Sequence, residues 1–280
     1  MRDILMKNSL ASILNTAGAF IRKDMKIALS YRMQFVFQFA QIFFSVSVVY
    51  FIGKMLADKS GDAIASYDSG YFAFALVGIA INNYLHVGLV TITNEIRQTM
   101  NQGTLEAMCA APLSYAEFIV CSSLWQFVFE TFRVVLYFLF AMVIFGLRLN
   151  NINWLSTFLC MSVTIPVFLL LGTMSCSILI VIKRGDPVNW FFSSAGALLA
   201  GTMFPVSVLP DWLQAVSVFL PLTHALNAAR KAILTGAAPR DIASSLLVLG
   251  VWFLLLVPAA LFINRECMTV AKRQGAFSTF

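Results

Sequence analysis

Three features of the sequence predict an all-α membrane protein with six transmembrane helices. Hydrophobic residues make up 60% of the 280 positions, charged residues only 11%, and the mean hydropathy is +0.83; a soluble domain carries about 25% charged residues. The apolar residues gather into stretches of about 20, the length that a helix needs to cross the hydrocarbon core. Short polar segments separate these stretches, so the chain is better described as a single transmembrane domain, 1–280, than as soluble domains.

Residues 10–30 are expected to form an amphipathic helix ahead of the first span. One arc of this helix collects Leu10, Leu14, Ala17, Ile21, Met25, Ala28 and Leu29, with Arg22, Lys23 and Lys26 beside it. Such a helix can lie in the membrane interface with its basic side toward anionic headgroups. Packing on another protein surface is the alternative. The residues before it lack the short apolar core and cleavage site of a signal peptide.

The apolar stretches define six spans and one shorter segment. The predicted spans are 33–55, 71–93, 118–146, 154–182, 188–204 and 242–263. The segment 205–235 is punctuated by Pro205, Pro210 and Pro221. Its apolar run is too short to cross the bilayer, which suits re-entrant or interfacial short helices.

Positive residues predict the orientation, because cytoplasmic loops carry the excess of Lys and Arg. With the N-terminus inside, the cytoplasmic segments hold twelve, namely Arg2, Lys7, Arg22, Lys23, Lys26, Arg32, Arg97, Lys183, Arg184, Arg265, Lys272 and Arg273. The opposite side holds six, namely Lys54, Lys59, Arg148, Arg230, Lys231 and Arg240. Both termini are therefore expected in the cytoplasm.

Polar and aromatic side chains inside the spans are candidates for a substrate path. They are Asn82, Asn83, His86, Glu130, Arg133, Phe191 and Phe192. Glu130 and Arg133 share a helix face at i, i+3 and can neutralise each other, either in a gate or path or as a structural pair. The polar group at 82–86 could line a water-accessible path or bond a neighbouring helix. The aromatic and small residues of the fifth span suit an amphiphilic conduit, but also close helix packing.

Several kinds of site are not expected. The five cysteines form no C-x-x-C pair and the two histidines are isolated, so ordinary zinc-ligand spacing is absent. There is no basic stripe interleaved with aromatics of the kind that binds nucleic acid. The phosphate-binding pattern G-x-x-x-x-G-K-[S/T] is missing, since Gly53-Lys54 is followed by Met55. We therefore expect no cofactor on this chain, and any ATP and Mg²⁺ on a separate polypeptide.

The connection after the second span is built as a short helix rather than a plain loop. Gly103 ends the preceding helix, Thr104 can cap a new one with Glu106 near its positive end, and Pro112 stops it. A plain connector needs only a few residues. The residues 104–111 are therefore predicted to form a cytoplasmic helix that presses on another component.

Two segments resemble the ABC type-2 permeases. Gly103-Thr104-Leu105-Glu106 followed by Ala111-Pro112-Leu113-Ser114 is similar to that family's coupling helix. The run from Met203 through Phe204, Pro205 and Pro210 to Leu213, then Leu220-Pro221 and Ala228-Ala229-Arg230, resembles its signature before the last span. The likeness extends over nearly the whole chain, from the amphipathic start to the last span.

The resemblance implies an exporter permease of the bacterial inner membrane. Two copies of such a chain would form the path, and two cytoplasmic ABC ATPase subunits would drive it. The coupling helix and the basic residues Arg22 and Lys23 would lie on those ATPases. Relatives export drugs, lipids and lipid-linked glycans, so an amphiphilic substrate is implied. The alternatives are a lipid-modifying membrane enzyme or intramembrane hydrolase, and a passive channel.

Overall fold

The computed structural model describes residues 9–56, 70–101, 115–149, 151–182 and 185–273, and their regular secondary structure is entirely helical. The first half contains α2 (Ser9–Ser30), α3 (Arg32–Leu56), α5 (Gly70–His86), η1 (Val87–Thr91), α6 (Ile92–Asn101), α8 (Tyr115–Val143) and α9 (Trp154–Ile182). The second half contains α10 (Pro187–Trp190), η2 (Phe191–Ala195), α11 (Gly196–Leu199), η3 (Val206–Val208), α12 (Asp211–Val218), α13 (Pro221–Leu234) and α14 (Ala243–Arg273). Here η1 and η2 are π-helical turns and η3 is a 3₁₀ turn.

Five helical stretches within the described residues are long and apolar enough to span a membrane. They are Phe35–Met55, Gly70–Gln98, Glu117–Val143, Trp154–Ile182 and Ala243–Cys267, the second of which runs unbroken through α5, η1 and α6. Each coincides with one of the six predicted spans. The all-helical membrane architecture predicted from the sequence is thus confirmed at this level.

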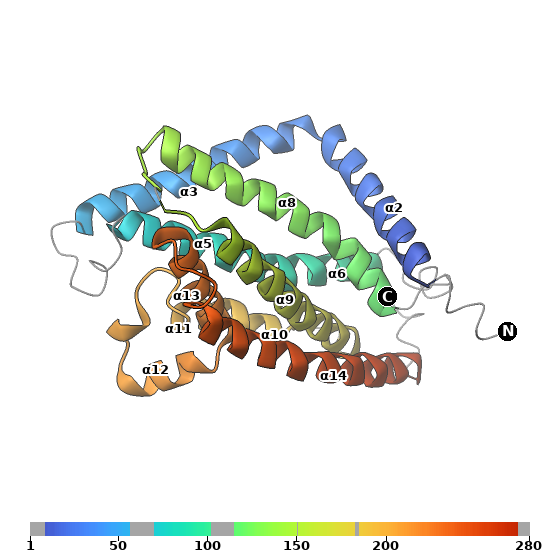
Figure 1. The fold of residues 1–280 in the computed structure, drawn as a ribbon. Coiled ribbons are helices and arrows are strands. Elements are labelled where there is room, and N and C mark those ends of the chain that lie inside the picture. The colour runs from blue at the N-terminus through green and yellow to red at the C-terminus, as the bar shows by residue number, and fades with distance from the viewer. Residues whose placement is uncertain (1–8, 57–69, 102–114, 150, 183–184, 274–280) are drawn as a thin grey trace.

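The helices form a bundle with a buried centre and apolar flanks. In the span through α5, 72% of an 18-residue apolar stretch is buried, and in α9 the share is 56%. In α3 and α8 the share is 22%, and in α14 it is 17%. The short helix α13 packs on α5, α9 and α14. In Figure 1, α3 and α8 lie on one side of this centre and α14 on the other. The outer helices therefore present their apolar residues to the bilayer rather than to the protein core.

The central helices approach so closely that only glycine fits. A Cβ added to Gly172 on α9 would lie 1.9 Å from the carbonyl oxygen of Gly88 in η1, and one added to Gly88 would lie 2.7 Å from the carbonyl oxygen of Phe168. Small residues allow such close backbone packing between helices in membranes. This contact fixes η1 against α9.

The predicted fifth span, 188–204, is shorter than expected. Its helical part runs from Pro187 to Leu199 through α10, η2 and α11. At 1.5 Å per residue this rises roughly 20 Å, less than the hydrocarbon core of roughly 30 Å. The backbone then turns at Gly201, where φ is +75°. The structure therefore contains a short helical segment there, and the membrane span predicted at 188–204 stays a prediction.

Three prolines of the predicted re-entrant segment open its short helices. Pro205 and Pro210 are the N-cap residues of η3 and α12, and Pro221 occupies the first turn of α13. Proline is well tolerated there because its missing N–H would have no intrahelical partner. The two short helices predicted within 205–235 are present, while their position in a membrane stays a prediction.

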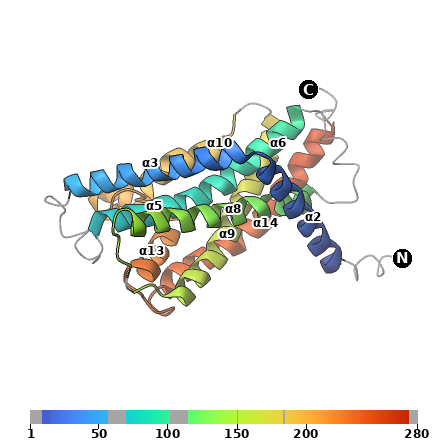
Figure 2. The same ribbon diagram turned by 90° about the horizontal axis from the view of Figure 1, so that it is seen from above.

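The start of α2 and the end of α14 lie at the same end of the molecule (Figures 1 and 2). The amphipathic helix predicted at 10–30 is present as α2, which turns sharply at Tyr31 into α3 and packs along α8. Phe20 and Phe118 make an edge-to-face contact with ring centroids 5.4 Å apart. Such aromatic pairs stabilise packing beyond their buried area.

Candidate functional site

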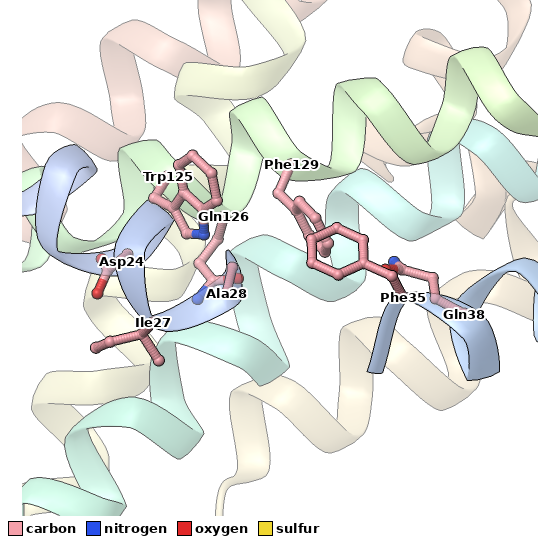
Figure 3. A pocket seen from close by; sticks show the side chains of 8 residues that line it. All are labelled: Asp24, Ile27, Ala28, Phe35, Gln38, Trp125, Gln126 and Phe129. Carbon is pink, nitrogen blue, oxygen red and sulfur yellow. The ribbon is translucent and has the colours of Figure 1, made fainter. Parts of the chain in front are cut away.

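A polar groove lies between α3 and α8, with α2 at one end and η1 at its floor. It consists of two adjoining pockets of about 350 and 170 Å³ that share Gln38, Gln126 and Phe129. The larger pocket is also lined by Phe37, Gln41, Val87, Thr91, Glu130 and Arg133, and the smaller by Asp24, Ile27, Ala28, Phe35 and Trp125. Figure 3 shows Trp125, Gln126 and Phe129 of α8 facing the end of α2 and the start of α3.

Helical spacing places the polar groups of the groove on facing stripes. Gln126, Glu130 and Arg133 follow one another at i, i+4 and i+7 on α8, so they share one face. Gln38 and Gln41 are similarly one turn apart on α3. Amide and charged groups thus line a groove whose surrounding helices are otherwise apolar.

The strongest electrostatic feature of the groove is the Glu130–Arg133 pair. Arg133 Nη1 donates to Glu130 Oε2 at 3.0 Å, and the Glu130 side chain is only 2% exposed while that of Arg133 is 22% exposed. Two further polar atoms, Glu130 Oε1 and Arg133 Nε, are buried and make no hydrogen bond of ordinary geometry to the described residues. A buried ion pair whose remaining polar atoms are unsatisfied stabilises a fold poorly. The unused hydrogen-bonding capacity therefore points to a polar ligand or water in the groove.

The structure brings together four of the residues predicted from sequence to line a path. Asn83 interacts with Glu130 across the α5–α8 contact, and the charge of Arg133 acts on His86. His86 itself is exposed. The neighbouring Tyr84 joins the same two helices by donating a hydrogen bond to Thr131 Oγ1 at 2.9 Å.

The other predicted path residues do not share these interactions. Asn82 is half-buried on α5, and Phe191 and Phe192 belong to η2, where their rings pack edge-to-face with centroids 5.2 Å apart. The structure does not place any of the three in the lining of the groove. They stay predictions as path residues.

Gln38, Gln41, Gln126 and Thr91 line the groove but were not among the predicted path residues. They lie within stretches that were predicted as spans from their average apolarity, although glutamines one turn apart within a span are a readable signal. Thr91 lies at the end of η1, and Val87 at its start also lines the groove. Single π-helical turns of this kind are frequent at functional sites.

The signature around Arg230 forms a separate, structural cluster. The guanidinium is 2% exposed and donates to the carbonyl oxygens of Gly201 and Thr202 at 2.9 and 2.8 Å. It also stacks on the ring of Phe74 with 3.5 Å between the guanidinium carbon and the ring centroid. Arg230 thereby ties α13 and the turn after α11 to α5. Its charge is therefore buried within the bundle, while its side of the membrane stays a prediction.

The structure describes only some of the residues predicted to couple to an ATPase. Gly103, Thr104, Leu105, Glu106 and Pro112, with the coupling helix 104–111, lie outside the described residues. Arg22 and Lys23 are exposed on α2 and line an open pocket together with Asn15, Gly18, Ala19 and Lys26. Lys23 Nζ lies 3.1 Å from Asp24 and over the Phe20 ring. Arg22 and Lys26 are exposed on either side of this contact, and a role of these basic residues in coupling stays a prediction.

Comparisons with known proteins agree on one class of protein. Residues 19–234 match the family described as ABC-2 type transporter, from within α2 to the end of α13. A protein of Bacillus subtilis (strain 168), named "Putative transport permease YvfS", is 21% identical over 194 residues, which cover 69% of this chain and 78% of that protein. The matched family region contains every residue of the groove.

Proposed function

Because this chain belongs to the ABC-2 type transporter family, we propose that it is the permease subunit of an ATP-driven exporter. The exporter would move an amphiphilic substrate, a drug, lipid or lipid-linked glycan, from the cytoplasm or inner leaflet across a bacterial inner membrane. The observation that carries this proposal is the groove between α3 and α8. Amides and a buried ion pair face one another there, beside aromatic side chains, between helices whose outer faces are apolar. Such a surface matches a molecule with both polar and apolar parts.

We propose that the motor is a separate cytoplasmic ABC ATPase, present in two copies with ATP and Mg²⁺ bound to it. The exposed basic face of α2 supports a docking surface at one end of the bundle. The helix α6 ends at that same end of the bundle (Figure 1), as expected if a coupling helix that follows α6 acts together with α2. Both termini would lie in the cytoplasm with this docking surface.

The test is reconstitution of the chain with its co-purified ATPase in liposomes. Leu105→Pro should break the coupling helix and Glu106→Arg should reverse the charge at its start, so both variants should keep ATP hydrolysis while transport falls at least roughly tenfold. Glu266→Arg makes the same charge change at an exposed position near the end of α14 and should leave transport unchanged.

Three outcomes would contradict the proposal. Full transport by the chain without any ATPase would remove the need for a motor. Solute flux without nucleotide would identify a passive channel instead. Equal transport by Leu105→Pro and the unaltered chain would show that the connection 102–114 does not transmit the ATPase cycle.

A further inference from the structure

A second, apolar groove lies between α8 and α9, on the opposite side of α8 from the polar one. Its volume is about 320 Å³, and its lining comes from α5, α8, α9, the connection before α9 and one residue of α13. The floor is formed by Val77, Ala80, Ile81 and Tyr84, all at most 3% exposed. The rim is formed by Val135, Leu139, Met142 and Trp154, which are 43–75% exposed. The groove is thus open toward the apolar outside of the bundle.

The chemistry of this lining disfavours a polar occupant. The hydroxyl groups in it belong to Tyr84, Thr131 and Thr157. Tyr84 donates to Thr131 at 2.9 Å, Thr131 donates to the carbonyl oxygen of Phe127 at 2.8 Å, and Thr157 donates to that of Asn153 at 2.9 Å. A water molecule needs two to four polar partners to occupy a cavity. With its hydroxyl groups already bonded, the groove favours hydrocarbon.

The dimensions of the groove match one leaflet of a bilayer. Along α8 it extends from Thr131, near the middle of the helix, to Met142 at its end. Eleven residues at 1.5 Å each correspond to roughly 16 Å, about half of the hydrocarbon thickness. Trp154 closes the far end, where tryptophan is typical of the membrane–water interface. The exposed Arg148 directly precedes Leu149, which lines the groove, and supplies a positive charge at headgroup level.

We propose that this groove binds one acyl chain of a membrane phospholipid, whose phosphate pairs with Arg148. The chain would descend from Trp154 at the interface to the Tyr84–Thr131 hydrogen bond at mid-membrane. Each methylene withdrawn from water contributes to the binding of a lipid chain, but inside a bilayer the gain comes from packing and from the headgroup contact. The bound lipid would fill the gap between α8 and α9. This proposal requires only that the chain spans a bilayer, and not that it exports anything.

The test uses a phosphatidylglycerol with a photoactivatable diazirine in the middle of one acyl chain. The full-length protein is reconstituted in vesicles of unlabelled phosphatidylglycerol and phosphatidylcholine without any other amphiphile, irradiated, digested and mapped by mass spectrometry. Labelling should concentrate on the peptides containing Phe138, Met142 and Met161, above the level on the exposed face of α14. Val134→Trp fills the groove with an indole ring and should lower this labelling roughly tenfold.

Matched variants distinguish loss of lipid binding in the groove from a general loss of folding. Val128→Trp makes the same substitution on an exposed part of α8 outside the groove and should not change labelling. Met142→Trp fills the mouth from the exposed rim without touching the buried floor, so it replaces Val134→Trp if that variant fails to fold. Arg148→Gln should reduce labelling by phosphatidylglycerol several-fold. The proposal is overturned if groove labelling does not exceed that of α14, or if a folded groove-filling variant is labelled as strongly as the unaltered chain.

Discussion

At the residue scale, the buried ion pair of Glu130 and Arg133 is the feature whose burial costs the fold most stability. Both side chains lie in the bundle, yet one carboxylate oxygen and one guanidinium nitrogen make no hydrogen bond of ordinary geometry to the described residues. The attraction between two charges rarely repays the cost of removing both from water. Two roles stay open for such a pair: contact with a ligand that supplies further hydrogen bonds, or packing between the helices.

Removing one partner of this pair should be worse than removing both. Arg133→Met leaves the Glu130 carboxylate buried without its cation, and should lower the free energy of unfolding by about 3 kcal/mol, the lower end of the range for buried pairs because Arg133 is partly exposed. Glu130→Leu combined with Arg133→Met should recover most of that loss. Thermal unfolding in detergent measures both variants. Equal destabilisation of the single and double variants would argue against a coupled pair.

The activity of the double variant distinguishes a role of the pair in the substrate path from a purely structural role. If its charges contact the substrate, the stable double variant should lose substrate-stimulated ATP hydrolysis in the reconstituted complex. A double variant that is both stable and fully active would assign the pair to helix packing alone.

At the scale of elements, long spans could be predicted and interruptions could not. An apolar run of twenty residues leaves the chain little choice but a helix, because every backbone group must be bonded internally in lipid. The same run does not reveal where a helix stops. Residues 188–204 carry no charge, but their helical segment ends at Leu199 and the left-handed Gly201 turns the backbone. The partners of Arg230 could likewise not be predicted, because only the fold brings the carbonyls of Gly201 and Thr202 to it.

The close contact between Gly172 of α9 and Gly88 of η1 can be tested by substitution. Gly172→Ala would place a Cβ 1.9 Å from the carbonyl oxygen of Gly88, so the two helices must separate. We expect a loss of about 1–3 kcal/mol of stability, as for other overpacked cores. Gly250→Ala on α14 meets no atom within 4 Å and should instead be neutral or slightly stabilising, since alanine favours helix. Thermal unfolding compares them, and equal effects of the two would refute the close crossing.

At the scale of the whole molecule, one face of α3 remains without a partner in a single chain. Its buried face holds Ile42, Val46 and Val49, while the opposite face carries Phe37, Gln41, Phe44, Val48 and Phe51 in an exposed stripe at intervals of three and four residues. This is the spacing of a helix seam that packs against another helix. Two members of the stripe, Phe37 and Gln41, also line the polar groove. A second copy packed on this stripe would close the groove into a path between two chains.

Cysteine cross-linking tests this proposed homodimer. In a background whose five native cysteines are replaced by alanine, each stripe residue is changed to cysteine in turn and the membranes are oxidised. A disulfide requires Cα atoms within about 7 Å, so cross-linked dimers should appear at those stripe positions nearest the two-fold axis and recur every three or four residues. Leu254→Cys, equally apolar and exposed on α14, should remain monomeric on a non-reducing gel. Cross-linking at Leu254 but at none of the five stripe positions would move the interface, and with it the path, to the other side of the bundle.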